Sequence, residues 1–207
     1  AALPLALLAV ARAAVSSSQE QTTRLRMTNG CGSEAIWMAH MAASTPGPDP
    51  QNVKILPGES YDFIVLDGLA GTRYWPKMRC DADGNGCGIG ESGGPGELCG
   101  IKAGCAPPVD TKFEASFGQN GVDWVDMSLV DGFTLPFKFE MVTKPGKKCS
   151  AGDGNRNVTH VIDCSALSFD QCPSTENLGV LGASENLQVY HPDTRQTVGC
   201  YSPCSKL

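Results

Sequence analysis

A group of carboxylates near the middle of the chain has the residue types and spacing that carbohydrate chemistry would need. Asp123, Asp126 and Asp131 lie close together in the segment VDWVDMSLVDGFTLP, with Trp124 beside the first of them. Glu114 lies upstream, on the polar side of the alternating segment TKFEASF. Carboxylates bind sugars by accepting hydrogen bonds from hydroxyl groups, and paired carboxylates can cleave glycosidic bonds. We therefore predict a groove for a neutral or cationic polymer, with sugar as the leading candidate.

The roles within this group remain open at the level of residue types. A hydrolase would use Glu114 with Asp126 or Asp131 as its catalytic pair, one protonated and the other ionised. Arg73 would keep the second carboxylate ionised, and Trp124 would offer a flat apolar face to a sugar ring. A binding groove without chemistry is favoured over this hydrolase. A structural role, in which the aspartates cap turns or pair with arginines, ranks second and is also favoured over the hydrolase.

The composition indicates a secreted protein that disulfides stabilise. The chain has 207 residues and ten cysteines, a density typical of an oxidising compartment. Its formal net charge of −6 argues against binding of nucleic acid through phosphate contacts, which needs a basic surface. No apolar run reaches the ~20 residues that a membrane-spanning helix requires. We expect one domain and a monomer.

Targeting signals stand near both ends of the chain. An apolar run over residues 3–10 is followed by Ala11-Arg12-Ala13, which predicts part of a secretory signal peptide at residues 1–14. The sequon Asn157-Val158-Thr159 predicts glycosylation at Asn157. The final Ser205-Lys206-Leu207 matches a peroxisomal address, but the cysteines and the signal peptide contradict it, so we treat it as accidental. The predicted location is extracellular or vacuolar.

Short alternating segments predict an all-β, antiparallel β-sandwich. Apolar and polar residues alternate, with frequent turn signals between them, in residues 25–28, 61–65, 112–117, 124–129 and 137–141. Residues 44–51 are rich in proline and residues 81–100 in glycine, so both are expected to be loops. The expected domain covers residues 23–207. Residues 23–148 would form the sandwich, and residues 149–207 a disulfide-rich loop region with a short helix near 165–171.

Three further motifs are weaker. The segment Gly90-Glu91-Ser92-Gly93-Gly94 fits a hydrolase nucleophile motif but lacks the preceding strand and following helix. The segment from Asp81 to Gly86 matches half of a calcium-binding loop, yet Ser92 stands where the bidentate acid should be. The cysteine spacings differ from the C-x2-C of structural zinc sites. We predict neither a metal nor a cofactor.

An ordered series of motifs resembles the thaumatin-like family, which includes the osmotin and zeamatin types. The resemblance spans about residues 23–207, and its most specific segment is SLVDGF. The matching motifs are Asn29-Gly30-Cys31 with Trp37, Arg73-Tyr74-Trp75, Gly84-Asn85-Gly86-Cys87, Gly90 to Gly94 with Leu98-Cys99, Pro107-Pro108 with Thr111 to Glu114, Asp123 to Pro136, Cys172-Pro173, and Cys200 with Cys204.

The resemblance implies a flattened antiparallel β-sandwich with disulfide-rich loops beside an acidic cleft. By motif position, Arg73, Glu114, Asp126 and Asp131 would occupy four of the cleft positions, and a fifth acid would lie in a C-terminal stretch that we expect this chain to lack. It further implies a pathogenesis-related protein of antifungal defence that binds cell-wall β-1,3-glucan. A weak endo-β-1,3-glucanase and a protein-interaction module that inhibits microbial glycanases are the alternatives. Lys77, where the family usually has arginine, lowers the expectation of hydrolysis.

The resemblance also implies a set of disulfides. It pairs Cys80 with Cys87 and Cys172 with Cys200. Because Ser92 replaces a family cysteine and Cys105 is additional, Cys99–Cys105 is expected as a substitute pair. The partners of four further cysteines stay open, namely Cys31, Cys149, Cys164 and Cys204. In the family such cysteines normally pair with partners further along the chain. Alternatively they pair among themselves, for instance Cys149 with Cys164.

Overall fold

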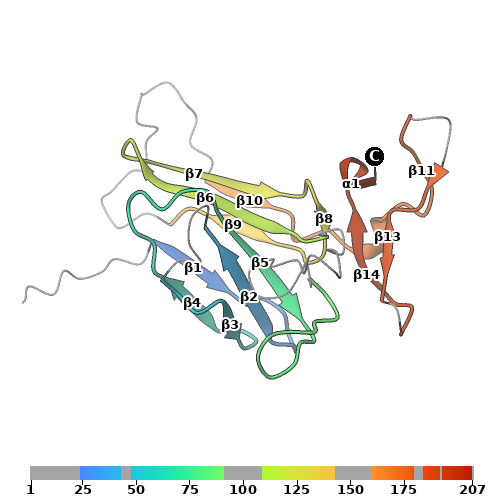
Figure 1. Ribbon diagram of the computed structural model, residues 1–207, viewed down its shortest axis with the longest axis horizontal. Helices are drawn as coiled ribbons and strands as arrows, with labels where there is room; N and C mark the ends of the chain where they lie inside the picture. Colours follow the sequence, from blue (N-terminus) through green and yellow to red (C-terminus); the bar gives the residue numbers. More distant parts are fainter. Residues whose placement is uncertain are drawn as a thin grey trace, which may run out of the picture.

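Strands dominate the computed structural model, which describes residues 24–42, 48–90, 109–142, 160–179, 184–191 and 193–206 (Figure 1). In chain order its elements are β1 (Leu25–Thr28), β2 (Ile36–Met41), β3 (Asn52–Ile55), β4 (Ser60–Phe63), β5 (Thr72–Met78), β6 (Lys112–Gln119), β7 (Val122–Ser128), β8 (Gly132–Phe133), β9 (Lys138–Glu140), β10 (Val161–Asp163), the 3-10 helix η2 (Phe169–Gln171), β11 (Glu176–Asn177), β12 (Ser184–Glu185), β13 (Gln188–Tyr190), β14 (Thr197–Tyr201) and α1 (Pro203–Lys206).

The main layer is a five-stranded antiparallel sheet with the order β3-β2-β5-β6-β7. Strand β6 shows why the sequence forms it. Phe113, Ala115 and Phe117 are buried on one face, while Glu114 and Ser116 alternate with them on the other. A period of two residues is what a strand with one face on the core requires. The alternation in residues 112–117 therefore predicted both the strand and its buried face.

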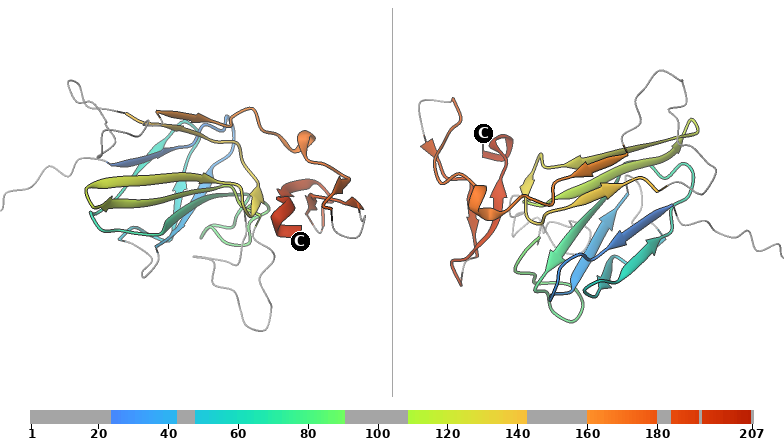
Figure 2. Two further views of the ribbon diagram at one scale, coloured as in Figure 1. Left: turned by 90° about the horizontal axis from the view of Figure 1, so that it is seen from above. Right: turned by 180° about the vertical axis from the view of Figure 1, so that it is seen from behind.

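A second layer covers the apolar face of this sheet and confirms the predicted antiparallel sandwich. It consists of the pairs β1-β4 and β9-β10 (Figures 1 and 2). A chain of aromatic rings joins the layers. The ring centroids of Phe63 on β4 and Tyr74 on β5 lie 5.0 Å apart, and those of Phe113 on β6 and Phe139 on β9 lie 5.9 Å apart. Such edge-to-face and offset contacts contribute beyond the area that they bury.

The part of the chain after residue 160 contains more regular structure than its polar sequence suggested. Strand β10 pairs with β9 and so belongs to the second layer of the sandwich. Strands β13, β14 and β8 form a separate three-stranded sheet at one end of the sandwich (Figure 2). The short helix expected near residues 165–171 is present as the 3-10 helix η2. These strands are short, and the pairings of β10 with β9 and of β14 with β8 join segments far apart along the chain, so local alternation did not reveal them.

Several sequence-based predictions fall outside the described residues. They concern the signal peptide at 1–14, the first half of the 44–51 loop, Ser92, Cys99, Cys105, Cys149 and the sequon at Asn157. Among the helices that the structure describes, none has the length and apolar character needed to cross a bilayer.

Candidate functional site

Three neighbouring strands place a cation and two carboxylates side by side on the face of the five-stranded sheet that points away from the sandwich core. Arg73 on β5 is the direct register partner of Glu114 on β6, and Glu114 is the direct partner of Asp126 on β7. Directly opposed residues in antiparallel strands have Cβ atoms about 4.5–5.5 Å apart. The strand register therefore produces a continuous polar row from residues that are far apart in the sequence.

This row forms the floor of an open groove with a volume of about 360 Å³. Trp124 lies further along β7, opposite Ser116 on β6, and 54% of its surface is exposed to solvent. The backbone N–H of Gly71, just before β5, donates to the Ser116 hydroxyl on β6 at 3.0 Å near this end of the groove. The lining residues are Gly71, Thr72, Arg73, Glu114, Ala115, Ser116, Trp124, Val125 and Asp126. Four of the five predicted cleft residues are thus neighbours in one groove.

Asp131 does not line the groove. Its carboxylate accepts a hydrogen bond from the Nζ of Lys112, whose side chain is only 3% exposed. Lys112 precedes Glu114 by two residues, so both side chains belong to the same face of β6. A buried ammonium needs a charged partner, and Asp131 supplies it. The sequence pattern predicts that Asp131 binds the ligand. In the structure its carboxylate instead pairs with the ammonium of Lys112.

Asp123 has a structural role as well. Both of its oxygens accept from Arg24, at 2.9 Å from Nε and 2.6 Å from Nη2. The backbone N–H of Gly118 donates to Asp123 at 2.8 Å, and Arg24 also reaches Asp67 at 2.5 Å. The hydrogen bond with Asp123 is the largest of the effects that raise the pKa of Arg24. Asp123 therefore connects the β6–β7 turn to the start of β1. By strand alternation its side chain belongs to one face of β7, whereas Trp124 and Asp126 belong to the other.

The alternation of residues did not predict that two lysines are buried on the sheet face that carries Arg73 and Glu114. Lys112 on β6 and Lys77 on β5 are both almost completely buried. The Nζ of Lys77 donates to the backbone carbonyl of Gly84 at 2.6 Å and so holds the loop after β5 against the sheet. The signal that could have found Lys112 is its position two residues before Glu114, on the polar side of TKFEASF. Its burial could not be read from the sequence.

Backbone hydrogen bonds to Asp81 stabilise the loop after β5. Asp81 Oδ1 accepts from the backbone N–H groups of Asp83 and Asn85 at 2.9 and 2.8 Å. Both bonds lower the pKa of Asp81, and the bond from Asn85 has the larger effect. Asp81 thus binds the loop's own backbone through this oxygen. Within the described part of the chain, no group of three potential ligand side chains could hold a metal ion.

Among the residues that the structure describes, two disulfides are formed, and they are the two pairs that the family pattern implies. Cys80 bonds to Cys87, and Cys172 bonds to Cys200. Cys164 is a free thiol, so the suggested Cys149–Cys164 pair is not formed. Cys31 and Cys204 are free thiols as well.

The groove can accept and donate hydrogen bonds but is open to water along its length. Carboxylates of Glu114 and Asp126 can accept from vicinal hydroxyls, and the guanidinium of Arg73 can donate to ring or hydroxyl oxygens. Trp124 adds an exposed aromatic surface at one end. Polar groups that fix orientation beside one apolar surface are typical of a binding site for a polyhydroxylated ligand.

Comparisons with known proteins agree with this architecture. The family model described as Thaumatin family matches residues 29–207. An osmotin-like protein of Nicotiana tabacum is 33% identical over 131 residues, which are 62% of this chain and 47% of that protein. A pathogenesis-related thaumatin-like protein 3.8 of Cryptomeria japonica is 27% identical over 96% of this chain and 93% of its own length. Pathogenesis-related protein 5 of Arabidopsis thaliana is 28% identical over 89% of this chain and 66% of its own length. The chain thus spans about half to two thirds of the tobacco and Arabidopsis relatives.

Proposed function

We propose that this chain, which belongs to the thaumatin family, is a secreted, defence-type thaumatin-like protein that binds β-1,3-glucan through the groove of Arg73, Glu114, Asp126 and Trp124. Relatives that are named as pathogenesis-related proteins support the defence role. The glucan, the groove and the extracellular location are part of the proposal.

The observation that carries the proposal is the in-register row of Arg73, Glu114 and Asp126 across β5, β6 and β7. Because all three side chains stand on adjacent strands of one rigid sheet, they need little ordering when a ligand binds, and binding loses less entropy. Trp124 extends the site along β7 and offers a surface for the apolar face of a sugar ring. A neutral, hydroxyl-rich chain lying across the strands could meet each of these groups.

Hydrolysis is the second candidate, since Glu114 and Asp126 are directly opposed on neighbouring strands. Retaining glycosidases hold their carboxyl groups about 5–5.5 Å apart and inverting ones about 6.5–9.5 Å apart, and the Cβ spacing of opposed strand residues is compatible with either. A general acid, however, is usually kept protonated by an apolar, water-poor pocket. This groove is open to solvent, which favours binding over cleavage.

Saturable binding to insoluble β-1,3-glucan tests the proposal directly. The purified protein is sedimented with increasing amounts of the glucan, and the unbound fraction is measured at fixed ionic strength. We expect Glu114→Gln to weaken binding about tenfold, since hydrogen bonds to charged groups contribute about 1.5–3 kcal/mol. Glu140→Gln is the matched control, because that side chain is 56% exposed on β9 and pairs with Lys138. The absence of saturable binding by the wild-type protein would refute the proposal.

Mass spectrometry of a soluble β-1,3-gluco-oligosaccharide separates binding from hydrolysis. After prolonged incubation, an unchanged oligosaccharide supports binding alone. Shorter products formed by the wild type but not by Glu114→Gln would establish a weak endo-glucanase. A protein that binds no glucan but forms a stable complex with a fungal glycanase would instead be an inhibitor of that enzyme.

A further inference from the structure

We propose a second binding site, specific for a carboxylate-bearing sugar residue, in a pocket formed by β2, β3 and the segment that follows β5. This pocket holds Trp37, Lys54 and Arg79 and has a volume of about 230 Å³. Its remaining lining residues are Glu34, Ala35 and Cys80. None of these residues belongs to the groove of Arg73 and Glu114.

The two sites are separated on the same sheet. Trp37 is the register partner of both Lys54 on β3 and Lys77 on β5. Lys77 is four residues beyond Arg73, which corresponds to about 13 Å along the strand. The pocket also lies at the β3 edge of the sheet, whereas the groove lies toward the β7 edge. A single sugar residue in the pocket therefore contacts none of the groove residues.

Lys54 is the first group that favours an anion. Its Nζ lies 5.2 Å from the centroid of the Trp37 ring, which holds the ammonium in place by a cation–π interaction. No carboxylate of the described residues lies within ion-pair distance of Lys54. The pocket therefore contains a positioned cation beside an aromatic wall.

Arg79 supplies a second cation, and its guanidinium has N–H donors beyond those that bind Glu34. Its Nε and Nη2 donate to Glu34 at 3.2 and 3.4 Å, and no described residue accepts from Nη1. Its backbone has a φ of 59°, in the left-handed region that a residue with a side chain rarely adopts. Strain of this kind persists only where the surroundings enforce it. Here the Cys80–Cys87 disulfide and the hydrogen bond from Gly88 N–H to the Arg79 carbonyl hold it.

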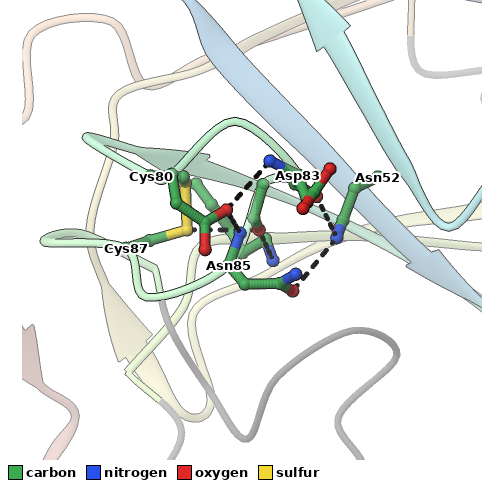
Figure 3. The surroundings of a disulfide bond; sticks show 8 residues. Asn52, Cys80, Asp83, Asn85 and Cys87 are labelled. Atoms are coloured by element: carbon green, nitrogen blue, oxygen red, sulfur yellow. Dashed lines mark hydrogen bonds between the residues drawn. A yellow bond between two sulfur atoms is a disulfide. The ribbon is translucent and has the colours of Figure 1, made fainter.

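The loop that begins at Cys80, one of the lining residues, is fixed by a disulfide and by hydrogen bonds (Figure 3). The Nδ2 of Asn52 donates to the Asp83 carbonyl at 3.2 Å and to Asn85 Oδ1 at 3.4 Å, beside the Cys80–Cys87 bond. Gly84 packs so closely on Trp37 that a Cβ at this position would stand 2.6 Å from the indole ring. The tryptophan is therefore held before any ligand arrives, which reduces the entropy lost on binding.

The charge balance of the pocket identifies the ligand class. Lys54 and Arg79 against Glu34 leave one net positive charge in a protein whose formal net charge is −6. The carboxylate of a uronic acid can accept from Lys54 Nζ and Arg79 Nη1, both charge-assisted hydrogen bonds. Its ring can contact the part of the Trp37 side chain that Lys54 and Gly84 leave exposed, and this apolar contact favours a sugar over a small inorganic anion. A neutral glucan lacks the charged group that this pocket would recognise.

Titration calorimetry at low ionic strength with trigalacturonate, an acidic trisaccharide, tests this site. We expect binding that weakens as salt is added, because the cations are exposed. Lys54→Gln should weaken it about tenfold, the effect of losing one charge-assisted hydrogen bond. Lys138→Gln, at an exposed lysine on β9, is the matched control and should leave the affinity unchanged. Thermal unfolding of each variant verifies that it is folded.

Three comparisons make the outcome decisive. The methyl ester of trigalacturonate, which is uncharged, should bind at least tenfold more weakly, and sodium acetate at equal carboxylate concentration should not displace trigalacturonate. The Glu114→Gln variant should retain its affinity for trigalacturonate, so that failure of the glucan proposal and of this one can be told apart. Equal binding of the ester, displacement by acetate, or an unchanged Kd for Lys54→Gln would each overturn the proposal.

Discussion

Replacing Asp131 by asparagine should destabilise the fold without weakening glucan binding. The carboxylate of Asp131 is the partner of the Lys112 ammonium, whose side chain is 3% exposed. Asp131→Asn keeps the shape of the side chain and removes only its charge. The substitution therefore leaves a buried ammonium with a weaker partner, and the cost of its desolvation is no longer offset.

The size of the effect follows from the burial of the two groups. Removing one partner of a fully buried ion pair costs about 3–5 kcal/mol. The Asp131 side chain is 35% exposed, and Lys112 has further partners, so we expect about 2 kcal/mol. For a chain of this length, that loss lowers Tm by about 4–8 °C. Calorimetric unfolding of the wild type and the variant at neutral pH measures it.

A second variant and a binding assay complete the test. Adding Lys112→Met to Asp131→Asn should recover part of the lost Tm, because the uncompensated charge is removed as well. Glucan affinity measured well below Tm should change less than twofold for Asp131→Asn and about tenfold for Asp126→Asn. A Tm within 1 °C of the wild type would refute the ion-pair argument. A larger loss of affinity for Asp131→Asn than for Asp126→Asn would show that Asp131 serves the ligand instead.

Three further predictions concern stability. Replacing Cys172 and Cys200, which are 28 residues apart, by alanine should cost about 3–4 kcal/mol through the added entropy of the unfolded chain, measured by denaturant unfolding; an unchanged midpoint would contradict this. Burial raises the pKa of Tyr74 to about 12, above its ordinary value of 10.0. The free energy of unfolding that this pKa shift contributes is present below pH 10 and is lost as the pH rises toward 12, by up to about 3 kcal/mol. Tyr74→Phe should show a smaller fall in Tm over this alkaline range, and an equal fall in both proteins would refute the prediction. Gly84→Ala should lower Tm by several degrees, because φ is +79° and the new Cβ would meet Trp37, and an unchanged Tm would show that the loop gives way.

Much of the sandwich was predictable because a strand with one buried face repeats every two residues. The alternation of Phe113, Ala115 and Phe117 with Glu114 predicted which face of β6 packs on the core and which face is polar. Strand β5 was harder to identify, because most residues on both of its faces are buried and alternation is lost. The strands after residue 160 were missed because they are short, and β10 and β14 pair with strands far back along the chain.

The sequence by itself determined the family, the antiparallel class and which side chains of β6 and β7 share a face. Only the tertiary structure decided which carboxylates line the groove. Asp126 lies there because β7 pairs with β6 in one particular register. Asp123 and Asp131, in the same short segment, are bound instead by Arg24 from the start of β1 and by the buried Lys112. The period of a strand is local and fixes only the face of a residue, whereas its charge partner depends on strand register and burial, which form only when distant segments pack together.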